Sequence, residues 1–435
     1  MSSRGDDAGA GPWRTIARVN KAQLRAGDRI LFEGGQTFPG TLRIGASGVS
    51  VSSYGWGRAT IDGGNGGAIR IEGCSRVAVH NVKLAGSGRK SGNTESGLTV
   101  SRASDIDIEE VEVTGFRSSG IAISGSRDVR VLRVHAYANG YAGISSDGET
   151  SERLRVAHCL TENNAGDPTA RDNHSGNGIV IGRTRGAVVE HCEARYNGWD
   201  MPWTGNGPVG IWSYESDDVT IQYCVSHHNR STAKDGGGFD FDGGMTNSVL
   251  QYNYSHDNFG SGYLICQYDG AQPFENNVVR YNISQDDGLM DHNAGIYVWV
   301  GGRGMKGAVV HNNTIFNNKG SAVVFDVMKK FAEPKPEFVF HNNILVSLGP
   351  QIRGGAANGR FMENLYWTIG ERGFSVDGFK SLEEWQRATG QEKGGRYADP
   401  LFMRERMESL ADPAQFRLLP GSPAGAAFGA FTAHP

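Results

Sequence analysis

The sequence predicts an all-β fold, a parallel β-helix solenoid in which each turn of the chain adds a strand to a growing sheet. Two repeating features and the composition lead to this prediction. Four strands in mid-chain begin with glycine, and each precedes a second strand; the glycine-led strands are residues 210–214, 238–242, 262–266 and 295–299. A repeated supersecondary unit of this kind is typical of a solenoid.

Alignment of the second strands brings one position into register from coil to coil. The step is 23 residues from Val111 to Val134 and 32 residues from Cys192 to Cys224, which suits one β-helix coil with its loops. The full column reads Val111, Val134, Cys159, Cys192, Cys224, Asn253, Asn282, Asn313 and Asn343. We expect this column to point inward, with its cysteines as buried thiols that form no disulfide framework.

Composition agrees with a solenoid and excludes other classes. The chain has 435 residues with 63 glycines and 38% hydrophobic residues, which suits many tight turns around a narrow core. The formal net charge of −4 creates no basic field, so we expect no nucleic-acid partner. No apolar run approaches the roughly 18 residues of a membrane span, so we expect no membrane partner.

Three parts of the chain are predicted. Residues 1–39 form an N-terminal cap with a short helix within 12–20, and residues 40–346 form the β-helix of about ten coils. Residues 347–435 form a C-terminal loop and helix cap that packs on the last coils. Its helix is expected at 381–389, where Ser381 and Glu384 have capping-box spacing.

The first residues carry no apolar signal segment. This fits an intracellular protein or a secreted or periplasmic one whose signal has been removed. We expect the secreted or periplasmic location.

A second column of polar residues follows the second strands. It comprises Asn139, Asn164, Asn197, Asn229, Asn258 and Asn318, with Asp287 once in their place. Such residues tolerate left-handed backbone angles and can bond from coil to coil, so we interpret them as structural. Four unequal insertions lie between this bend and the next glycine-led strand: 165–177, 198–209, 230–237 and 288–294. Loops gathered on one side of a solenoid usually mark its binding face.

Period-two alternation along the glycine-led strands predicts which side chains lie on that face. If residues such as Ile211 and Phe239 point inward, seven others point outward: Trp212, Tyr214, Asp240, Asp242, Cys266, Tyr297 and Trp299. Five loop residues would wall the same cleft: Trp199, Trp203, Asp235, Asp291 and His292. Aromatic rings that stack on sugars, beside carboxylates that bond hydroxyl groups, suit a glycan-binding cleft.

Asp240 and Asp242 are the predicted catalytic pair, with Asp291 as a further catalytic candidate. Their α-carbons should lie roughly 6.6 Å apart on one strand face. That spacing leans toward the roughly 6.5–9.5 Å carboxyl separation of an inverting glycosidase without excluding the shorter retaining distance. Their titrations should be coupled, raising one pKa. The predicted substrate-binding residues are Trp203, Trp212, Tyr214, Glu215, Asp235, Tyr297, Trp299 and His292.

Structural interpretations of the same residues stay open. The aspartates of 236–244 could bind Ca²⁺ or cap loop amides. Glu215 also fits a solvated turn residue. His227 and His256 recur at one coil position, which favours a structural stack over a ligand set.

The coil pattern over about residues 40–346 resembles the right-handed parallel β-helix proteins of the pectin-lyase-like superfamily. The segments that carry the resemblance are Gly210-Ile-Trp-Ser-Tyr-Glu-Ser-Asp-Asp218, Asp235-Gly-Gly-Gly-Phe-Asp-Phe-Asp242 and Gln251-Tyr-Asn-Tyr-Ser-His-Asp-Asn258, and the tail Asp399-Pro-Leu-Phe402 with Phe416-Arg-Leu-Leu-Pro-Gly-Ser-Pro423 is similar to the usual ending. The resemblance implies a right-handed coil and activity on polysaccharides. The polygalacturonase and pectate-lyase motifs do not occur, so no catalytic residue is carried over.

We therefore predict a glycoside hydrolase acting on a neutral or weakly charged poly- or oligosaccharide, without a metal or other cofactor, as a monomer or homotrimer. The first alternative is a Ca²⁺-dependent polysaccharide lyase, because a bound cation could bridge Asp240 or Asp242 to a uronate. The second alternative is a glycan-binding β-helix without catalytic activity.

Overall fold

The computed structural model describes residues 12–292, 294–333, 335–403 and 412–431. The chain divides into two compact units: unit 1 comprises Met1–Pro208 with Ser231–Ala233, and unit 2 comprises Val209–Arg230 with Lys234–Pro435. Parts of the predicted caps, residues 1–11, 404–411 and 432–435, lie outside the described residues, as does position 293 of the fourth insertion.

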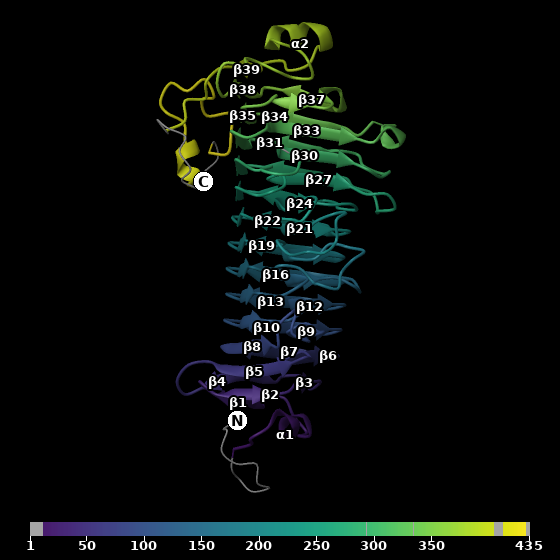
Figure 1. Ribbon diagram of the computed structural model, residues 1–435, viewed down its shortest axis with the longest axis vertical. Coiled ribbons are helices and arrows are strands. Elements are labelled where there is room, and N and C mark those ends of the chain that lie inside the picture. The colour runs from purple at the N-terminus through teal and green to yellow at the C-terminus, as the bar shows by residue number, and fades with distance from the viewer. Residues whose placement is uncertain (1–11, 293, 334, 404–411, 432–435) are drawn as a thin grey trace. The chain divides into compact units, whose positions relative to one another are not determined.

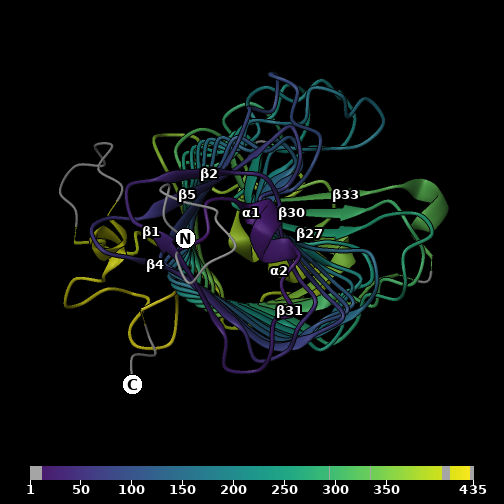
Figure 2. The ribbon, with the colours of Figure 1, turned by 90° about the horizontal axis from the view of Figure 1, so that it is seen from below.

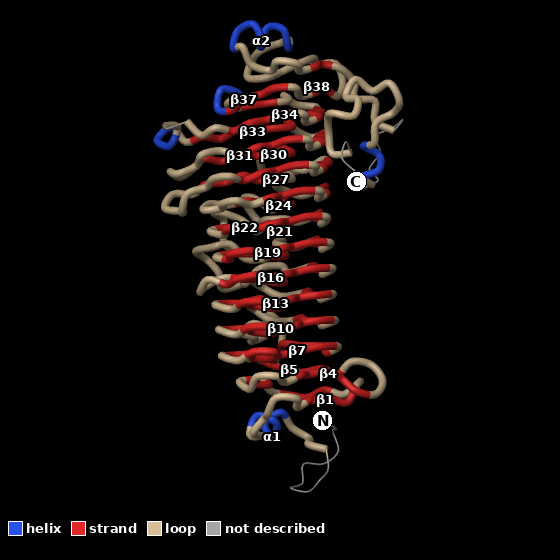
Figure 3. The backbone as a smooth tube through the Cα atoms, turned by 180° about the vertical axis from the view of Figure 1, so that it is seen from behind, coloured by secondary structure: helices blue, strands red, loops and turns tan. Residues whose placement is uncertain are grey.

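Coils of three short strands build each unit, and the strands of successive coils pair in parallel. We name the three resulting sheets A, B and C. Within each unit the strands of a sheet lie above one another (Figure 1 and Figure 3). The described residues supply seven strands of sheet A in unit 1 and six in unit 2, where the sequence analysis expected about ten coils.

Unit 1 contains the following strands. Sheet A comprises β1 (Arg29–Glu33), β4 (Ser50–Tyr54), β7 (Ser75–His80), β10 (Ser104–Glu109), β13 (Arg127–Leu132), β16 (Ser151–Ala157) and β19 (Thr184–Glu190). Sheet B comprises β2 (Thr37–Pro39), β5 (Ala59–Gly64), β8 (Val82–Gly86), β11 (Glu112–Thr114), β14 (His135–Tyr137), β17 (Leu160–Glu162) and β20 (Glu193–Arg195). Sheet C comprises β3 (Leu42–Ile44), β6 (Ile69–Glu72), β9 (Leu98–Ser101), β12 (Ser119–Ser124), β15 (Ala142–Ser146) and β18 (Asn177–Gly182).

Unit 2 repeats the arrangement. Sheet A comprises β22 (Asp217–Gln222), β25 (Val249–Gln251), β28 (Asn277–Arg280), β31 (Ala308–His311), β34 (Phe338–His341) and β37 (Gly359–Met362). Sheet B comprises β23 (Val225–His227), β26 (Tyr254–His256), β29 (Ile283–Gln285), β32 (Thr314–Asn317), β35 (Ile344–Ser347), β38 (Leu365–Thr368) and β39 (Arg396–Tyr397). Sheet C comprises β21 (Val209–Tyr214), β24 (Gly237–Phe241), β27 (Tyr263–Gln267), β30 (Ala294–Val300), β33 (Ser321–Val327) and β36 (Ile352–Arg353).

The second strand expected in each coil is in fact two strands, one in sheet A and one in sheet B. A residue with a left-handed backbone separates them, such as Tyr223 (φ 53°) after β22 and Tyr252 (φ 56°) after β25. Such a residue ends the extended run and redirects the chain. Buried, inward side chains lie on both sides of it, such as Leu250 before Tyr252 and Asn253 after it, which is why the sequence pattern looked continuous.

The predicted inward asparagine column is confirmed in unit 2. Along Asn253, Asn282, Asn313 and Asn343, each backbone N–H and Nδ2 donates to Oδ1 of the next residue at 3.0–3.1 Å. Asn364 continues the column, and the carboxylate of Glu392 accepts its last hydrogen bonds. Buried amides are therefore paired from coil to coil, which avoids the cost of leaving them unsatisfied.

The bend column is also a hydrogen-bonded ladder, with one correction. Asn229 donates to Asn258, and Asn258 donates to Asp287. In the following coil Asn317, rather than the expected Asn318, is buried and bonds to the Asp287 carbonyl oxygen. Strand β32 runs one residue further than β29, so alternation turns residue 317 inward and residue 318 outward.

Each unit has one α-helix at an end of its stacked coils. In unit 1, α1 (Ile16–Asn20) begins after Thr15, whose side chain accepts a hydrogen bond from the Arg18 N–H; it is shorter than predicted and lies across the end of the coils (Figure 2). In unit 2, α2 (Leu382–Thr389) begins after Ser381, whose Oγ accepts from the Glu384 N–H. Unit 2 also contains three short 3-10 helices among the described residues: Lys329–Phe331, Ala356–Asn358 and Pro413–Phe416.

The C-terminal segment packs on the outer face of sheet B in unit 2, where it descends beside the strands (Figure 3). Phe402, Phe416 and Phe428 contact an apolar surface formed by Tyr254, Ile283, Phe316, Ile344, Val346 and Leu365. The N–H of Ala430 also donates to Oγ1 of Thr314 at 3.0 Å. All five cysteines are buried and none forms a disulfide, as predicted. No helix of the described residues is long and apolar enough to cross a membrane.

Candidate functional site

The outward side chains of sheet C in unit 2 form two columns. Cross-strand register places Trp212 beside Asp240, Asp240 beside Leu264, and Leu264 beside Tyr297. The neighbouring column holds Cys266 beside Trp299 and Trp299 beside Asp326. Tyr214 and Asp242, two residues beyond Trp212 and Asp240, lie in that second column. The structure thus brings together the strand residues that alternation placed on one face.

Much of this face is covered, contrary to expectation. Asp240 is 2% exposed, Trp212 5% and Cys266 6%, whereas Tyr214, Asp242, Tyr297 and Trp299 are partly exposed. Alternation gives the direction of a side chain but not what lies over it.

Loops of unit 2 fold back onto the face. The Tyr268 hydroxyl donates to Glu215 Oε1 at 2.9 Å. The ring of the same tyrosine lies against Gly243, where an added Cβ would approach it to 2.6 Å. Glu215 is therefore a bonded turn residue beside the face rather than a fully solvated one.

Burial perturbs both predicted catalytic carboxyls. Loss of water raises the pKa of Asp240 well above its usual value, and the charges of Asp242 and Asp235 add to that effect. Its Oδ1 has no hydrogen-bond partner among the described residues. Burial raises the pKa of Asp242 to about 6, although hydrogen bonds from the Cys266 thiol and the Gly243 N–H act in the opposite direction. Both carboxyls therefore favour the protonated form more than a solvated aspartate does, and hydrogen bonds oppose this effect at Asp242.

Three of the predicted loop residues form a cluster of their own. Nε2 of His292 lies 3.3 Å from Asp235 Oδ1 and 3.2 Å from Asp291 Oδ2, and the Asp235 N–H donates to Asp291 Oδ2 at 2.9 Å. The imidazole stacks on the Tyr297 ring with centroids 4.0 Å apart, which joins the loop to the strand face. Two carboxylates and one imidazole could hold a divalent cation, but the nitrogen donor favours transition metals over Ca²⁺.

Two contributors were not assigned a role by sequence reasoning. The Tyr297 hydroxyl donates to Asp326 Oδ2 at 2.9 Å, and burial together with the Asp326 charge raises the pKa of that tyrosine. Asp326 follows the apolar residues 322–325 in a strand that has no leading glycine. Only its alignment with Trp299 on the neighbouring strand could have indicated from the sequence that it lies on this face. Tyr268 lies in a turn, where alternation makes no prediction.

Trp203 and Trp199 belong to unit 1. Nε1 of Trp203 donates to Asn206 Oδ1 at 2.8 Å, and the Arg89 guanidinium lies 5.6 Å from the centre of the Trp199 ring. Their predicted place beside Asp240 stays a prediction.

Parallel strands stacked coil on coil around a narrow apolar core define a β-helix protein. A family model described as right handed beta helix region matches residues 47–198 and 169–329. The chain therefore belongs to the right-handed β-helix family and has the pectin-lyase-like type of fold. No curated protein has a significantly similar sequence.

Several solved structures are similar to this chain at low sequence identity. A GH136 lacto-N-biosidase from Eubacterium ramulus is similar with a TM-score of 0.55 and 18% identity, over 82% of this chain and 65% of that protein. Pectate lyase Pel9A has 15% identity and a TM-score of 0.46, over 97% and 89% of the two chains. PfbA, a surface adhesin of Streptococcus pneumoniae, has 11% identity and a TM-score of 0.47, over 78% and 82%. The chain thus spans less than two thirds of the lacto-N-biosidase.

Proposed function

We propose that this protein is a glycoside hydrolase that cleaves a neutral or weakly charged poly- or oligosaccharide, with Asp240 as proton donor and Asp242 as its ionised partner. The observation that carries the proposal is a pair of neighbouring carboxyls in different surroundings: Asp240 is buried and its Oδ1 has no hydrogen-bond partner among the described residues, whereas Asp242 is partly exposed and accepts a hydrogen bond from the Gly243 N–H. Hydrolysis of a glycosidic bond needs one protonated and one ionised carboxyl at the same pH.

The roles follow from the environments of the two groups. Asp240 would protonate the glycosidic oxygen, since burial raises the pKa of its carboxyl well above the usual value and so favours the protonated form. Asp242 would either activate a water molecule or attack the sugar carbon, which are the inverting and retaining routes. The partly exposed rings of Tyr214 and Trp299, in the column of Asp242, offer surfaces on which a sugar can stack. Substrate binding by Trp203, Asp235 and His292 stays a prediction.

Charge favours a neutral substrate over a polyuronate. Asp235, Asp240, Asp242, Asp291 and Asp326 all lie on the face or in the loops that meet it, and a polyanion would be repelled. Two nearby lysines that could offset this charge are paired elsewhere, Lys306 with Glu275 and Lys330 with Asp269. The similarity to a lacto-N-biosidase is compatible with the proposal, and so is a secreted or periplasmic location.

A cation-dependent polysaccharide lyase is the second candidate. The Asp235, Asp291 and His292 cluster favours it, because a bound cation would reverse the local charge and could hold a uronate. β-Elimination makes an unsaturated product that absorbs ultraviolet light, whereas hydrolysis makes only new reducing ends. A screen of neutral and uronate glycans read by both signals separates the two reactions.

Variants of the carboxyl pair test the proposal directly. Asp240→Asn and Asp242→Asn keep the shape of each side chain but remove its titration, so turnover on the glycan found in the screen should fall by about 10²-fold or more. The matched control is Asp269→Asn, which removes an exposed carboxylate of unit 2 and should leave turnover unchanged. Turnover close to that of the wild type in both single variants, with an unchanged Tm, would show that this strand is structural.

A further inference from the structure

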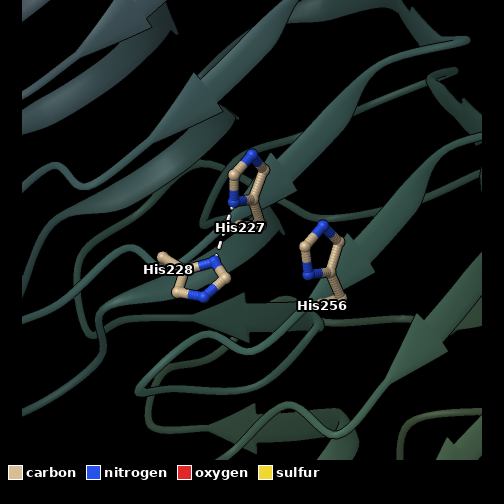
Figure 4. A group of neighbouring side chains, drawn as sticks. All are labelled: His227, His228 and His256. Atoms are coloured by element: carbon tan, nitrogen blue, oxygen red, sulfur yellow. Dashed lines mark hydrogen bonds between the residues drawn. The ribbon is translucent and has the colours of Figure 1, made fainter. Parts of the chain in front are cut away.

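Three imidazoles gather on the outer face of sheet B in unit 2 (Figure 4). Asp240 lies on a strand of sheet C instead. Cross-strand register places His227, at the end of β23, beside His256, at the end of β26. Their rings stack with centroids 4.5 Å apart and planes 9° apart. The ring of His228 stands edge-on to both, at 5.0 Å from His227 and 5.6 Å from His256. One ring nitrogen from each of the three lies within 4.8 Å of the other two.

The backbone explains why consecutive histidines share this spot. Outward residues of neighbouring strands stack in a β-helix, which accounts for His227 and His256. His228 follows the strand with a left-handed backbone (φ 54°), so its side chain leaves the strand alternation and turns toward the stacked pair. Asp257 occupies the same position in the next coil, with φ 54°, and places a carboxylate beside the cluster.

We propose that His227, His228 and His256 form a binding site for a divalent transition metal ion of the Zn²⁺, Ni²⁺, Co²⁺ and Cu²⁺ class. Neutral imidazole nitrogens are good ligands for these ions, whereas Ca²⁺ and Mg²⁺ prefer oxygen. The site is independent of the proposed hydrolase activity, because none of its residues lies on sheet C.

Coordination needs the stacked rings to turn, because an imidazole binds a metal ion in the plane of its own ring and the planes of His227 and His256 are only 9° apart. Nδ1 of His227 and Nδ1 of His228 are 2.8 Å apart and share a hydrogen bond. Ligands of a tetrahedral metal with bonds of about 2.0–2.1 Å lie about 3.3 Å from one another. Replacement of the shared proton by a metal therefore opens this pair by about 0.5 Å. The nitrogen of His256 must approach by no more than about 1.5 Å, given the upper limit of 4.8 Å.

A carboxylate already orients one of the ligands. Nδ1 of His256 lies 2.9 Å from Asp257 Oδ2. When Nε2 of His256 binds the ion, Asp257 pairs with the second ring nitrogen, an arrangement that fixes the ring and increases its basicity and whose loss usually weakens binding about 10–100-fold. An ion held here would join two successive coils beside the C-terminal segment, since Tyr254 of the same strand contacts that segment.

Isothermal titration of the tag-free full-length protein with ZnCl₂ and NiCl₂ at pH 7.5 tests the site. In the His292→Asn background, which removes a ligand of the other candidate cation cluster, we expect one ion bound per chain, no heat with CaCl₂ or MgCl₂, and a rise in Tm on adding Zn²⁺ because the ion binds the folded state. His228→Asn should lower the affinity at least about 10-fold, and asparagine suits the left-handed backbone there. Asp257→Asn should lower it about 10–100-fold.

Two further variants keep the test decisive. His227→Gln places at this position the residue type that Gln285 provides in the same column, so it gives a second ligand deletion if His228→Asn does not fold. His341→Asn is the matched control. It removes one ring from the stacked pair His311 and His341, whose centroids are 4.8 Å apart and which belongs to no group of three potential ligands among the described residues. This variant should bind Zn²⁺ as the wild type does. Three results would overturn the proposal. They are no Zn²⁺ binding by the wild type, wild-type affinity for Zn²⁺ in both ligand deletions, and loss of binding in His292→Asn alone.

Discussion

Asp287→Asn should stabilise the protein at neutral pH and remove part of its pH dependence. Asp287 is fully buried in the bend ladder, at the position that Asn229 and Asn258 hold in the preceding coils. Its carboxylate accepts from Nδ2 of Asn258 at 2.8 Å and from Oγ of Ser284 at 2.7 Å. An asparagine could keep both contacts, because Nδ2 of Asn258 already donates to Oγ of Ser255 at 3.1 Å in the same local geometry.

The magnitude follows from the pKa of the carboxyl. Burial raises the pKa of Asp287 from 3.8 to about 7, although the hydrogen bonds from Ser284 and Asn258 oppose this. Since the pKa in the folded state is higher than in the unfolded state, the folded state holds the proton between pH 4 and 7. Proton binding by Asp287 therefore stabilises the folded wild type fully below about pH 4, and this stabilisation is lost as pH rises through 7. A shift of about 3 units corresponds to about 4 kcal/mol at most.

Thermal unfolding of wild type and Asp287→Asn between pH 4.5 and 8.5 measures this difference. An unfolding entropy of about 2.1 cal/mol/K per residue gives about 0.9 kcal/mol/K for this chain, so the variant should gain about 4 °C in Tm relative to the wild type across that range. Asp286→Asn is the matched control, because the neighbouring carboxylate is partly exposed. A Tm difference that does not change with pH, or the same pH dependence in the control, would refute the reasoning.

Three further predictions concern the candidate site. As a hydrolase the protein should keep full activity in excess EDTA, since acid–base chemistry by paired carboxyls needs no metal; loss of activity that Ca²⁺ restores would instead support the lyase. Trp299→Ala should raise KM by a factor that corresponds to about 1 kcal/mol of stacking with little change in Tm, since its ring is partly exposed. Trp212→Ala should lower Tm, because the ring is buried and its loss costs about 3–5 kcal/mol. Unchanged KM in Trp299→Ala would remove that ring from the substrate contacts.

The fold could be predicted because stacking repeats the same constraint in every coil. The Asn253, Asn282, Asn313 and Asn343 column admits one register, and that register is the one observed. The division into three sheets was missed because left-handed residues such as Tyr223 carry no recognisable sequence sign. Histidine, tyrosine, asparagine and aspartate all occur at such positions, so residue type alone does not mark the turn.

The sequence predicted the directions of the side chains in the candidate site but not their burial or their contacts. Alternation brought Asp240 and Asp242 to one face, and both point there in the structure. The burial of Asp240 depends on what covers its side chain, which local periodicity does not describe. Tyr268 over Gly243 and the stack of His292 on Tyr297 are contacts between loops and strands far apart in sequence. Only the three-dimensional arrangement shows them.

The different pKa values of Asp240 and Asp242 arise from their neighbours along the two outward columns. Asp240 lies between Trp212 and Leu264, and its Oδ1 has no hydrogen-bond partner among the described residues, whereas Asp242 receives hydrogen bonds from Cys266 and Gly243 that stabilise its ionised form. Turnover should therefore rise through about pH 6 as Asp242 ionises and decline at higher pH when Asp240 loses its proton.

Leu264→Asn tests this account, because it places an amide donor beside Asp240. The donor should stabilise the ionised form of Asp240 and lower its pKa. The high-pH limb of the turnover profile should then move to lower pH, while the limb near pH 6 stays in place. Leu264→Met is the control for the changed side chain: it stays apolar and of similar volume without adding a donor, so Asp240 stays shielded from water and both limbs should stay where they are. If the high-pH limb of Leu264→Asn coincides with that of the wild type in a folded variant, the proton donor is a group other than Asp240.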